Sequence, residues 1–410
     1  MRKRCVFALF IALVTGFVSG VLPAQETPPA DASAVVGGNT TFALELYAKL
    51  RAGEGNIFFS PMSISTALAM TYAGARGVTA EEMAKVLHVP NDALAHAGFG
   101  ALLRELDELG KTKGCKLSTA NALWGARGEE FLPGFLKLVK DNYGGGLERL
   151  DFAGAPEESR KTINAWVEKK TEQKIKDLLI EGDIKPVTVL VLTNAIYFKG
   201  DWEVQFDKKL TVEGVFRHRP GDEIWDHLPP LVPMMKRTGS VPYLKGDGFQ
   251  AVELPYVGKS LSMVVFLPDQ VEGLPAFEKS LAPDRLAGWL KGFDEEHVVL
   301  TLPKFTMTVR CGELAETLAE MGMPSAFGPD ADFSGINGKK DLFISKVIHK
   351  AFVDVNEEGT EAAAATAVIM MKSAVRRVVE FRADHPFVFL IRDNVSGSIL
   401  FMGRVVNPKT

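Results

Sequence analysis

The sequence predicts one large domain of the mixed α+β class, and three observations support this prediction. At 410 residues with 46% hydrophobic side chains, the chain can fill a substantial core. Helical apolar spacing dominates the first third, whereas long apolar runs typical of β-strands dominate the rest. No Pro/Gly/Ser-rich linker longer than a loop divides residues 35–410, so we expect a single domain without internal repeats.

The N-terminus has the pattern of an export signal. Arg2-Lys3-Arg4 precede an apolar run from Val6 to Val18, and Leu22-Pro23-Ala24 offers a cleavage site. The run is short for a bilayer span, so no membrane anchor is expected. Residues 1–24 are therefore predicted to be a signal peptide and residues 25–34 a disordered lead-in. This implies a secreted, extracellular protein, or a periplasmic one in a bacterium.

Helices are expected mainly in the first third. Phe42, Leu46 and Leu50 repeat at helical spacing, and Pro61 can open a second helix that continues to Ala73. Further helices are expected from about Thr79 and over Leu94–Leu109, Ser159–Gln173 and Glu313–Met321.

Strands are expected where apolar and β-branched residues form runs. These runs are Ile57–Ser60, Leu117–Trp124, Val187–Phe198, Val252–Leu254, Leu261–Leu267, Val298–Phe305, Leu342–Val355 and Phe387–Arg392.

Charge and motifs exclude several classes of function. A formal net charge of −4 disfavours a nucleic-acid binder. The sequence lacks the Gly-x-Ser-x-Gly, His-Glu-x-x-His and Cys-x-x-Cys motifs, and its seven histidines are scattered, so neither catalysis, a metal site nor a cofactor is expected. Cys115 and Cys311 could form a disulfide or remain two buried thiols, and the sequence leaves both alternatives open.

One stretch near the C-terminus has nearly balanced conformational preferences. Its alanines favour a helix, whereas the β-branched residues on both sides of it favour a sheet. Such a segment is a candidate conformational switch. Its residues are Glu357, Glu358, Gly359, Thr360, Glu361, Ala362, Ala363, Ala364, Ala365 and Thr366.

Motifs along residues 35–408 resemble those of the serpin family. Asn56–Ser65 is similar to its N-terminal signature, Thr193–Trp202 to its central-strand signature and Phe381–Ile391 to its C-terminal pattern. Three shorter matches lie between them: Glu253–Tyr256, Leu302–Phe305 and Ala331–Ile336.

The resemblance implies about nine helices, three β-sheets and an exposed reactive-centre loop. It also implies an inhibitor of serine endopeptidases, with cysteine endopeptidases as further targets. The target cleaves the loop, the loop inserts into the main sheet as an extra strand, and the acyl-enzyme is trapped. The protease supplies the catalysis. The alternatives are a non-inhibitory serpin that acts as a binding or carrier protein and, more remotely, a secreted hydrolase of unusual fold.

The loop sequence itself suits insertion. Side chains alternate across a strand, so Thr360, Ala362, Ala364, Thr366, Val368 and Met370 share one uncharged face. Extended, residues 360–373 would span ~43 Å at ~3.3 Å per residue. A globular chain of this size is ~55 Å across, so the loop could cross most of the molecule.

The resemblance also assigns site residues. Ser60, Ser63, Asn194 and His349, called the polar cluster below, match the positions of hydrogen-bonding residues beneath the opening sheet. Trp202 is expected near the upper end of that opening.

Hinge spacing from Gly359 places the cleaved bond at Ser373–Ala374, which suits an elastase-like protease. The alternative bond, Lys372–Ser373, suits a trypsin-like protease. Cleavage at Arg376 or Arg377 is expected to give only substrate behaviour, because the tether would be longer. No heparin-type cofactor is expected, because Leu102–Leu109 is net acidic, and the protein is expected to be a monomer.

Overall fold

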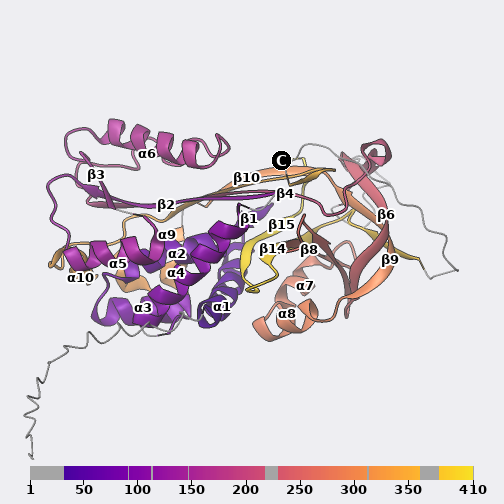
Figure 1. The fold of residues 1–410 in the computed structure, drawn as a ribbon, viewed down its shortest axis with the longest axis horizontal. Helices are drawn as coiled ribbons and strands as arrows, with labels where there is room; N and C mark the ends of the chain where they lie inside the picture. The colour runs from indigo at the N-terminus through magenta and orange to yellow at the C-terminus, as the bar shows by residue number, and fades with distance from the viewer. Residues whose placement is uncertain are drawn as a thin grey trace, which may run out of the picture.

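The computed structural model describes residues 32–409 except for gaps at 91, 112–113, 146, 218–229, 312–313 and 361–377. The described part is an elongated α+β structure, so the predicted class is confirmed (Figure 1). The predicted signal peptide lies outside the described residues. The first helix begins at Ser33, two residues before the expected start of the ordered domain at residue 35.

Most helices come from the first third of the chain and lie in the left half of Figure 1, with α6 above the long strands and α7 and α8 below the strands to the right. The helices are α1 (Ser33–Leu50), α2 (Pro61–Tyr72), α3 (Gly77–Leu87), α4 (Asp92–Leu109), α5 (Pro133–Tyr143), α6 (Pro156–Lys170), α7 (Leu274–Ser280), α8 (Pro283–Leu290), α9 (Leu314–Met321) and α10 (Ser334–Asn337), with 3₁₀ turns η1 (Lys208–Leu210) and η2 (Pro324–Phe327).

The strands form two hydrogen-bonded networks among the described residues. They are β1 (Ile57–Phe59), β2 (Cys115–Ala126), β3 (Leu147–Leu150), β4 (Leu190–Asp201), β5 (Val212–Val215), β6 (Leu231–Lys245), β7 (Phe249–Pro255), β8 (Leu261–Pro268), β9 (Asp294–Pro303), β10 (Phe305–Cys311), β11 (Ile348–Val355), β12 (Gly359–Thr360), β13 (Val379–Arg382), β14 (Phe387–Asp393) and β15 (Ile399–Val405).

The six-stranded network has the order β10-β11-β12-β4-β2-β3 and runs along the long axis of the molecule (Figure 1). Helix α6 covers one face, where Ile163 and Val167 pack with Trp124 and Ala195. Helices α2 and α4 cover the other face (Figure 1). Both faces are therefore buried, and the strands are correspondingly apolar.

The nine-stranded network contains the other strands, in the order β1-β15-β14-β8-β7-β6-β9-β13, with β5 beside β6. Three sheets are expected from the family resemblance, and two of them are continuous here because β6 is long. Its end at Tyr243–Lys245 pairs with β7, and Met234–Tyr243 pairs with β9. Strand β6 therefore joins the strands beyond β7 to strands β9 and β13 in one continuous network.

Several strand predictions need correction. Strands β3, β5, β6, β13 and β15 were not among the expected runs, and the predicted run Val298–Phe305 divides between β9 and β10. Strand β6 was not expected, because Pro233, Gly239 and Pro242 interrupt its apolar pattern, and its ladder with β9 compensates for the low intrinsic preference. The predicted strand Leu342–Val355 pairs only from Ile348, because residues 341–347 have no neighbouring strand among the described residues.

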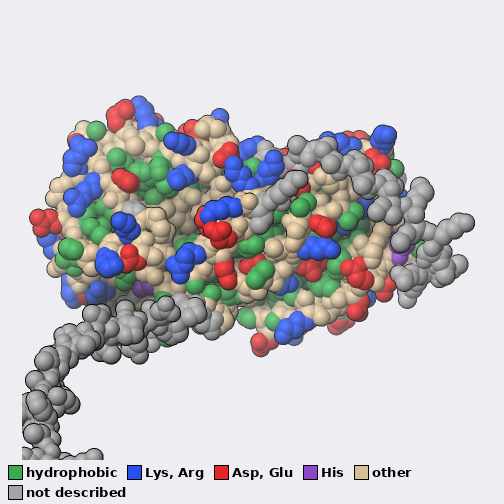
Figure 2. All heavy atoms as spheres, in the orientation of Figure 1, with side chains coloured by type: hydrophobic (Ala, Val, Ile, Leu, Met, Phe, Trp, Pro, Cys, Tyr) green, Lys and Arg blue, Asp and Glu red, His purple; other side chains and the backbone are tan. Residues whose placement is uncertain are grey.

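The surface carries interspersed charges. In the face shown by Figure 2, Lys and Arg alternate with Asp and Glu rather than forming one broad basic area. Among the described residues, no helix combines the length and the apolar character that crossing a membrane requires.

Candidate functional site

The junction between β4 and β11, called the seam below, has a closed part and an open part. In the closed part the two strands pair directly and in parallel, with Thr193–Tyr197 opposite Ile348–Phe352. In the open part β12 lies between them: Thr360 is opposite both Gly200 of β4 and Val355 of β11. Gly359 and Thr360, the third and fourth residues of the predicted hinge, thus already form a strand of the sheet.

Gly359 is required at the start of β12 because the backbones approach closely. A Cβ atom at this position would lie 2.0 Å from the carbonyl oxygen of Gly200 and 2.6 Å from Cα of Asp201. Both contacts are with backbone atoms, which cannot rotate away. The glycine therefore allows β12 to enter beside β4.

The turn from β11 into β12 is held by Asn356 and by the segment after β4. The side-chain oxygen of Asn356 accepts hydrogen bonds from the backbone N–H groups of Glu358 (3.0 Å) and Gly359 (3.3 Å). The indole N–H of Trp202 donates to the carbonyl of Asn356 (3.0 Å), and its backbone N–H donates to that of Glu358 (2.9 Å). Trp202 therefore lies at the open end of the seam.

Two buried glutamates of this turn are neutralised by lysines. Glu357 accepts from Thr211 (2.9 Å) and pairs with Lys304 (3.1 Å), and Glu358 pairs with Lys208. Burial opposes ionisation of Glu357, but hydrogen bonds from its own backbone N–H and from Thr211, together with Lys304, lower its pKa. The bond to Glu358 raises the pKa of Lys208. The carboxylate of Glu357 is thus kept charged at the hinge.

Thr360 is completely buried and is anchored through its hydroxyl. Its Oγ1 lies 2.9 Å from the hydroxyl of Tyr256, whose ring stacks on Trp202 with 4.7 Å between the ring centroids. The position thus accepts a small polar side chain and has no room for a charge.

The polar cluster lies in the closed part of the seam, where the structure brings its four residues together. The backbone N–H of Ser60 donates to Nε2 of His349 (3.0 Å), and Nδ1 of His349 bonds to Oδ1 of Asn194. The amide of Asn194 donates to Oγ of Ser63 (2.7 Å), and Oγ of Ser60 accepts from the N–H of Ser63 (3.1 Å). The expected mutual hydrogen bonds are therefore present.

His349 is a neutral member of this cluster. Because Nε2 accepts a hydrogen bond, the ring proton is on Nδ1, which donates to Asn194. The side chain is fully buried, and this burial lowers its pKa to about 3. The neutral ring thus links the start of α2 to the two strands of the seam.

Several contributors to the site were not predicted. Asn121 of β2 accepts from Ser63 and Asn194 (both 3.0 Å), and Tyr256 and Asn356 hold the hinge as described above. Asn121 stood inside an apolar predicted strand; its signal was the polar side chain in a buried register opposite Asn194.

Other predicted residues lie outside the described part of the chain. They are the remaining hinge residues Glu361, Ala362, Ala363, Ala364, Ala365 and Thr366, and the candidate cleavage residues Lys372, Ser373 and Ala374.

The cysteines and possible metal ligands form no further site among the described residues. Cys115 and Cys311 are free thiols, which resolves the alternatives left by the sequence. Burial raises their pKa values to about 11 and about 12, respectively, which makes both poor nucleophiles. In the described ranges, no cluster of three His, Cys, Asp or Glu side chains could hold a metal ion.

Comparison with known families identifies this architecture. Residues 37–408 match the family model described as serpin (serine protease inhibitor). The chain belongs to the serpin family. This serpin is 43% identical to leukocyte elastase inhibitor of Bos taurus and 44% identical to serpin B6 of Macaca fascicularis, each match covering 90% of this chain and 98% of the relative.

The fold comparison agrees with this assignment. The crystal structure of human thyroxine-binding globulin complexed with its hormone superposes with a TM-score of 0.82 at 30% identity. The match covers 92% of this serpin and all of that chain.

The expected secreted, extracellular or periplasmic location is wrong. Leukocyte elastase inhibitor and serpin B6 are intracellular serpins, which contradicts it. The expectation depended on charge and hydropathy in residues 1–24, which lie before the matched range 37–408 and outside the described residues. Neither the family match nor the described structure therefore supports the predicted signal peptide.

Proposed function

We propose that this serpin inhibits serine endopeptidases by a suicide-substrate mechanism. The target protease cleaves the reactive loop, the loop inserts into the seam, and the covalent acyl-enzyme is trapped. The observation that carries the proposal is β12, because a two-residue strand already separates β4 from β11 at one end while both strands still pair directly below it.

The register of β12 supports continued insertion. Asn194 lies opposite His349 in the closed part, and Gly200 and Val355 lie opposite Thr360 in the open part. An antiparallel strand that continues from Thr360 in this register has the same offset to both neighbours. It would enter without slipping, and Thr366 would arrive between Asn194 and His349.

That arrival would replace the broken contact of the polar cluster. Insertion separates Asn194 from His349, which would leave buried polar atoms unsatisfied. Thr366 carries a hydroxyl on the inserted face, where its neighbours are alanine and valine. A hydroxyl both donates and accepts, so it can bond to the two separated side chains.

Incubation with a panel of elastase-like and trypsin-like proteases tests the mechanism. An inhibitor gives an SDS-stable complex and a large rise in the midpoint of thermal unfolding after cleavage. A binding or carrier protein gives neither, and the similarity to thyroxine-binding globulin makes this the alternative to exclude. N-terminal sequencing of the released fragment identifies the bond.

Thr360→Arg tests the insertion step directly. The guanidinium would have to enter a completely buried site beside Tyr256. Loop insertion should therefore be slower than hydrolysis of the acyl-enzyme, and the variant should behave as a substrate. Thr162→Arg, on the exposed face of α6, is the matched control. A Thr360→Arg protein that traps protease at the wild-type stoichiometry contradicts the mechanism.

The target class follows from the bond that is cut. Cleavage at Ser373–Ala374 suits an elastase-like enzyme, in keeping with the name of the relative leukocyte elastase inhibitor, and cleavage at Lys372–Ser373 suits a trypsin-like enzyme. The comparison of second-order inhibition constants for the two classes separates these alternatives.

A further inference from the structure

A pocket at the edge of the six-stranded network lies outside the seam. Its volume is about 690 Å³, and its lining includes three consecutive residues of β10, Val309, Arg310 and Cys311. Strand β10 is the last strand of the network and pairs only with β11 among the described residues. Because successive side chains of a strand point to opposite faces, a pocket that contacts all three residues surrounds the free edge of β10. We call it the edge pocket.

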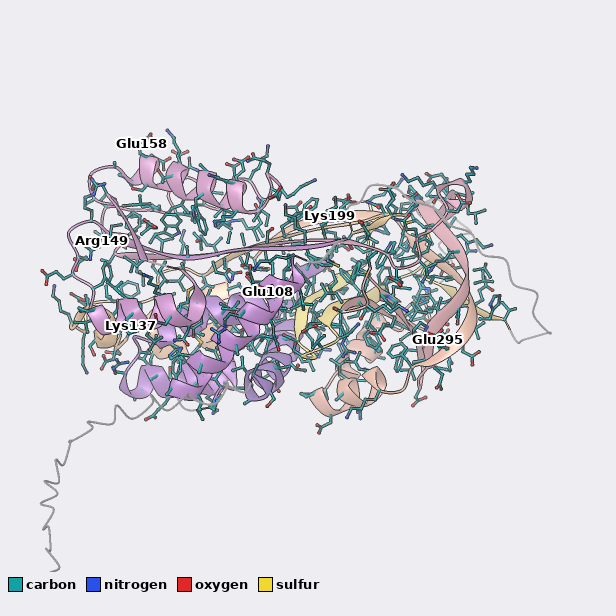
Figure 3. The ribbon with its side chains drawn as sticks, in the orientation of Figure 1. Glu108, Lys137, Arg149, Glu158, Lys199 and Glu295 are labelled. Carbon is teal, nitrogen blue, oxygen red and sulfur yellow. The ribbon has the colours of Figure 1, made fainter. Side chains whose placement is uncertain are left out.

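The edge pocket is separate from the hinge. Cys311 is opposite His349, which in turn is opposite Asn194, so the pocket is level with the closed part of the seam. Lys199 of β4, labelled in Figure 3, adjoins the open part instead. A ligand in the edge pocket would therefore leave Thr360 and the rest of the hinge uncovered.

Much of the wall of the edge pocket is apolar. Large aliphatic side chains from α1, β1, β10, α9 and the segment after α6 contribute to it: Leu50, Ile57, Val309, Leu314 and Ile180. Ile180 is 50% exposed, so its side chain offers apolar surface that a ligand can cover. The volume of the pocket falls within the range of about 300–1,000 Å³ that is typical of small-molecule sites.

The two cations of the edge pocket have more hydrogen-bond donors than they use. The carboxylate of Asp183 accepts from the backbone N–H of Ile180 (2.9 Å), from Arg310 (3.0 Å) and from Lys346 (2.6 Å). Arg310 also donates from Nε to the carbonyl of Leu178 (3.3 Å). A guanidinium carries five N–H groups and an ammonium three. Among the described residues, both side chains therefore keep N–H groups that a further acceptor can use.

The charges of the edge pocket favour an anion beside Asp183. This buried carboxylate is paired with both Arg310 and Lys346 and can neutralise only one of them. The other carboxylate in the lining, that of Glu54, belongs to the turn after α1 and is exposed, so water and salt screen its charge. One positive charge therefore remains next to the apolar wall.

We propose that the edge pocket binds a small amphipathic carboxylate, a molecule with one carboxylate group and an unbranched apolar chain. The carboxylate accepts hydrogen bonds from Arg310 and Lys346, and the chain lies against Ile180, Val309 and Leu314. Charge-assisted hydrogen bonds orient such a ligand, and burial of its chain contributes most of the affinity. The site is independent of the proposed inhibition mechanism, because it uses neither the reactive loop nor the hinge.

Calorimetric titration of the uncleaved protein with decanoate, below the concentration at which micelles form, tests the site. We expect one decanoate to bind per chain. 1-Decanol has the same chain without the charge and should bind about fivefold more weakly, because it cannot form the charge-assisted hydrogen bonds. The absence of saturable decanoate binding overturns the proposal, and so does an equal affinity for the two compounds.

Two substitutions with matched controls locate the ligand. Lys346→Gln should weaken decanoate binding about fivefold and leave decanol binding unchanged, whereas Ile180→Ser should weaken the binding of both compounds about fivefold. The two side chains are 48% and 50% exposed, so neither change should prevent folding. Lys339→Gln and Val78→Ser, at exposed positions outside the pocket lining, are the controls. Site variants that bind decanoate as tightly as the controls do would overturn the proposal.

Alkylation of the two thiols provides an independent readout, because Cys311 lines the edge pocket and Cys115 lies at the start of β2. Burial raises the pKa of both thiols, so their reaction with iodoacetamide at pH 9 is slow and can be followed by mass spectrometry of the peptides. Bound decanoate should slow the alkylation of Cys311 several-fold and leave that of Cys115 unchanged. If Cys311 reacts equally fast with and without decanoate, or if both thiols are slowed alike, decanoate does not occupy the edge pocket and the proposal is overturned.

Discussion

The open and closed parts of the seam are held by different kinds of interaction. At the open part, the glutamates of the hinge pair with Lys208 and Lys304, whose side chains are 62% and 44% exposed. At the closed part, the polar cluster is buried and neutral, and it links both strands to α2. The two strands are thus separated where water can reach the lysines of the ion pairs. They remain paired where the polar cluster is shielded from water.

This difference assigns separate tasks to the two parts. Each of these ion pairs joins a buried glutamate to a lysine that reaches solvent, so the lysine can leave its partner and be hydrated at small cost. Buried hydrogen bonds cost more to break, because each freed group is left without a partner. We therefore expect substitutions in the polar cluster to lower the free energy of unfolding most. Substitutions at the hinge should lower it less and should mainly reduce inhibition.

The largest expected effect is that of His349→Ala. It leaves the N–H of Ser60 and Oδ1 of Asn194 unsatisfied beside a new cavity and should lower the free energy of unfolding by about 4 kcal/mol. Urea titration measures this loss, and size-exclusion chromatography after mild heating should show polymers. His297→Ala on β9 is the control. A His349→Ala protein that stays monomeric and fully active would show that the cluster does not hold the seam closed.

The second largest expected effect is that of acid, which should reduce the stability contributed by the closed part of the seam. The folded protein holds His349 neutral with a pKa of about 3, whereas its ordinary value is 6.5. Its contribution is therefore fully present above pH 6.5 and decreases as the pH falls toward 3, by about 3 kcal/mol at pH 4. The difference in unfolding free energy between wild type and His349→Gln, measured from pH 7 to pH 4, isolates this contribution. A constant difference contradicts it.

Gly359→Ala should act at the open part. The added methyl group meets backbone atoms of Gly200, so β12 must leave the sheet, at a cost of about 2 kcal/mol. The stoichiometry of inhibition should rise several-fold because the first step of insertion is lost. Gly134→Ala, where a Cβ meets nothing within 4 Å, should inhibit normally. An equal stoichiometry of inhibition for both variants would show that β12 does not contribute to inhibition.

The smallest expected effect is that of Lys304→Met. Glu357 loses a partner that is itself partly exposed and keeps its bond to Thr211, so the loss should be about 1 kcal/mol. The midpoint of thermal unfolding should fall slightly, and the fall should disappear in high salt. Lys209→Met nearby serves as the control. A loss as large as that of His349→Ala would abolish the contrast between the two parts.

Much of the fold and the site could be predicted because several physical signals agreed. Pro61 after a short apolar run indicated the start of α2, and Ser60 caps that helix through the N–H of Ser63, as such a position favours. Thr360 and Trp202 lie at the open part of the seam. The class and the order of most elements follow from such agreement, whereas the four residues of the polar cluster were assigned through the family resemblance.

The remaining features depend on tertiary pairing, which local sequence does not contain. Asn121 joins the cluster only because β2 pairs with β4 in one register. Strand β6 forms despite its two prolines because β9 lies beside it. The run from Leu342 reads as a strand, and its unpaired start shows that the pattern indicates an extended backbone rather than the presence of a partner.

Trp202 gives the protein an internal fluorescent reporter. Its indole stacks on Tyr256 and bonds to the carbonyl of Asn356, so its emission depends on the polarity and geometry of the hinge. Trp124 of β2 and Trp166 of α6 lie against each other, Trp289 packs with Phe277 of α7, and the fifth tryptophan, Trp225, lies outside the described residues. The time course of a change in Trp202 emission would therefore follow the entry of the strand on the scale of a single turnover, without any attached label.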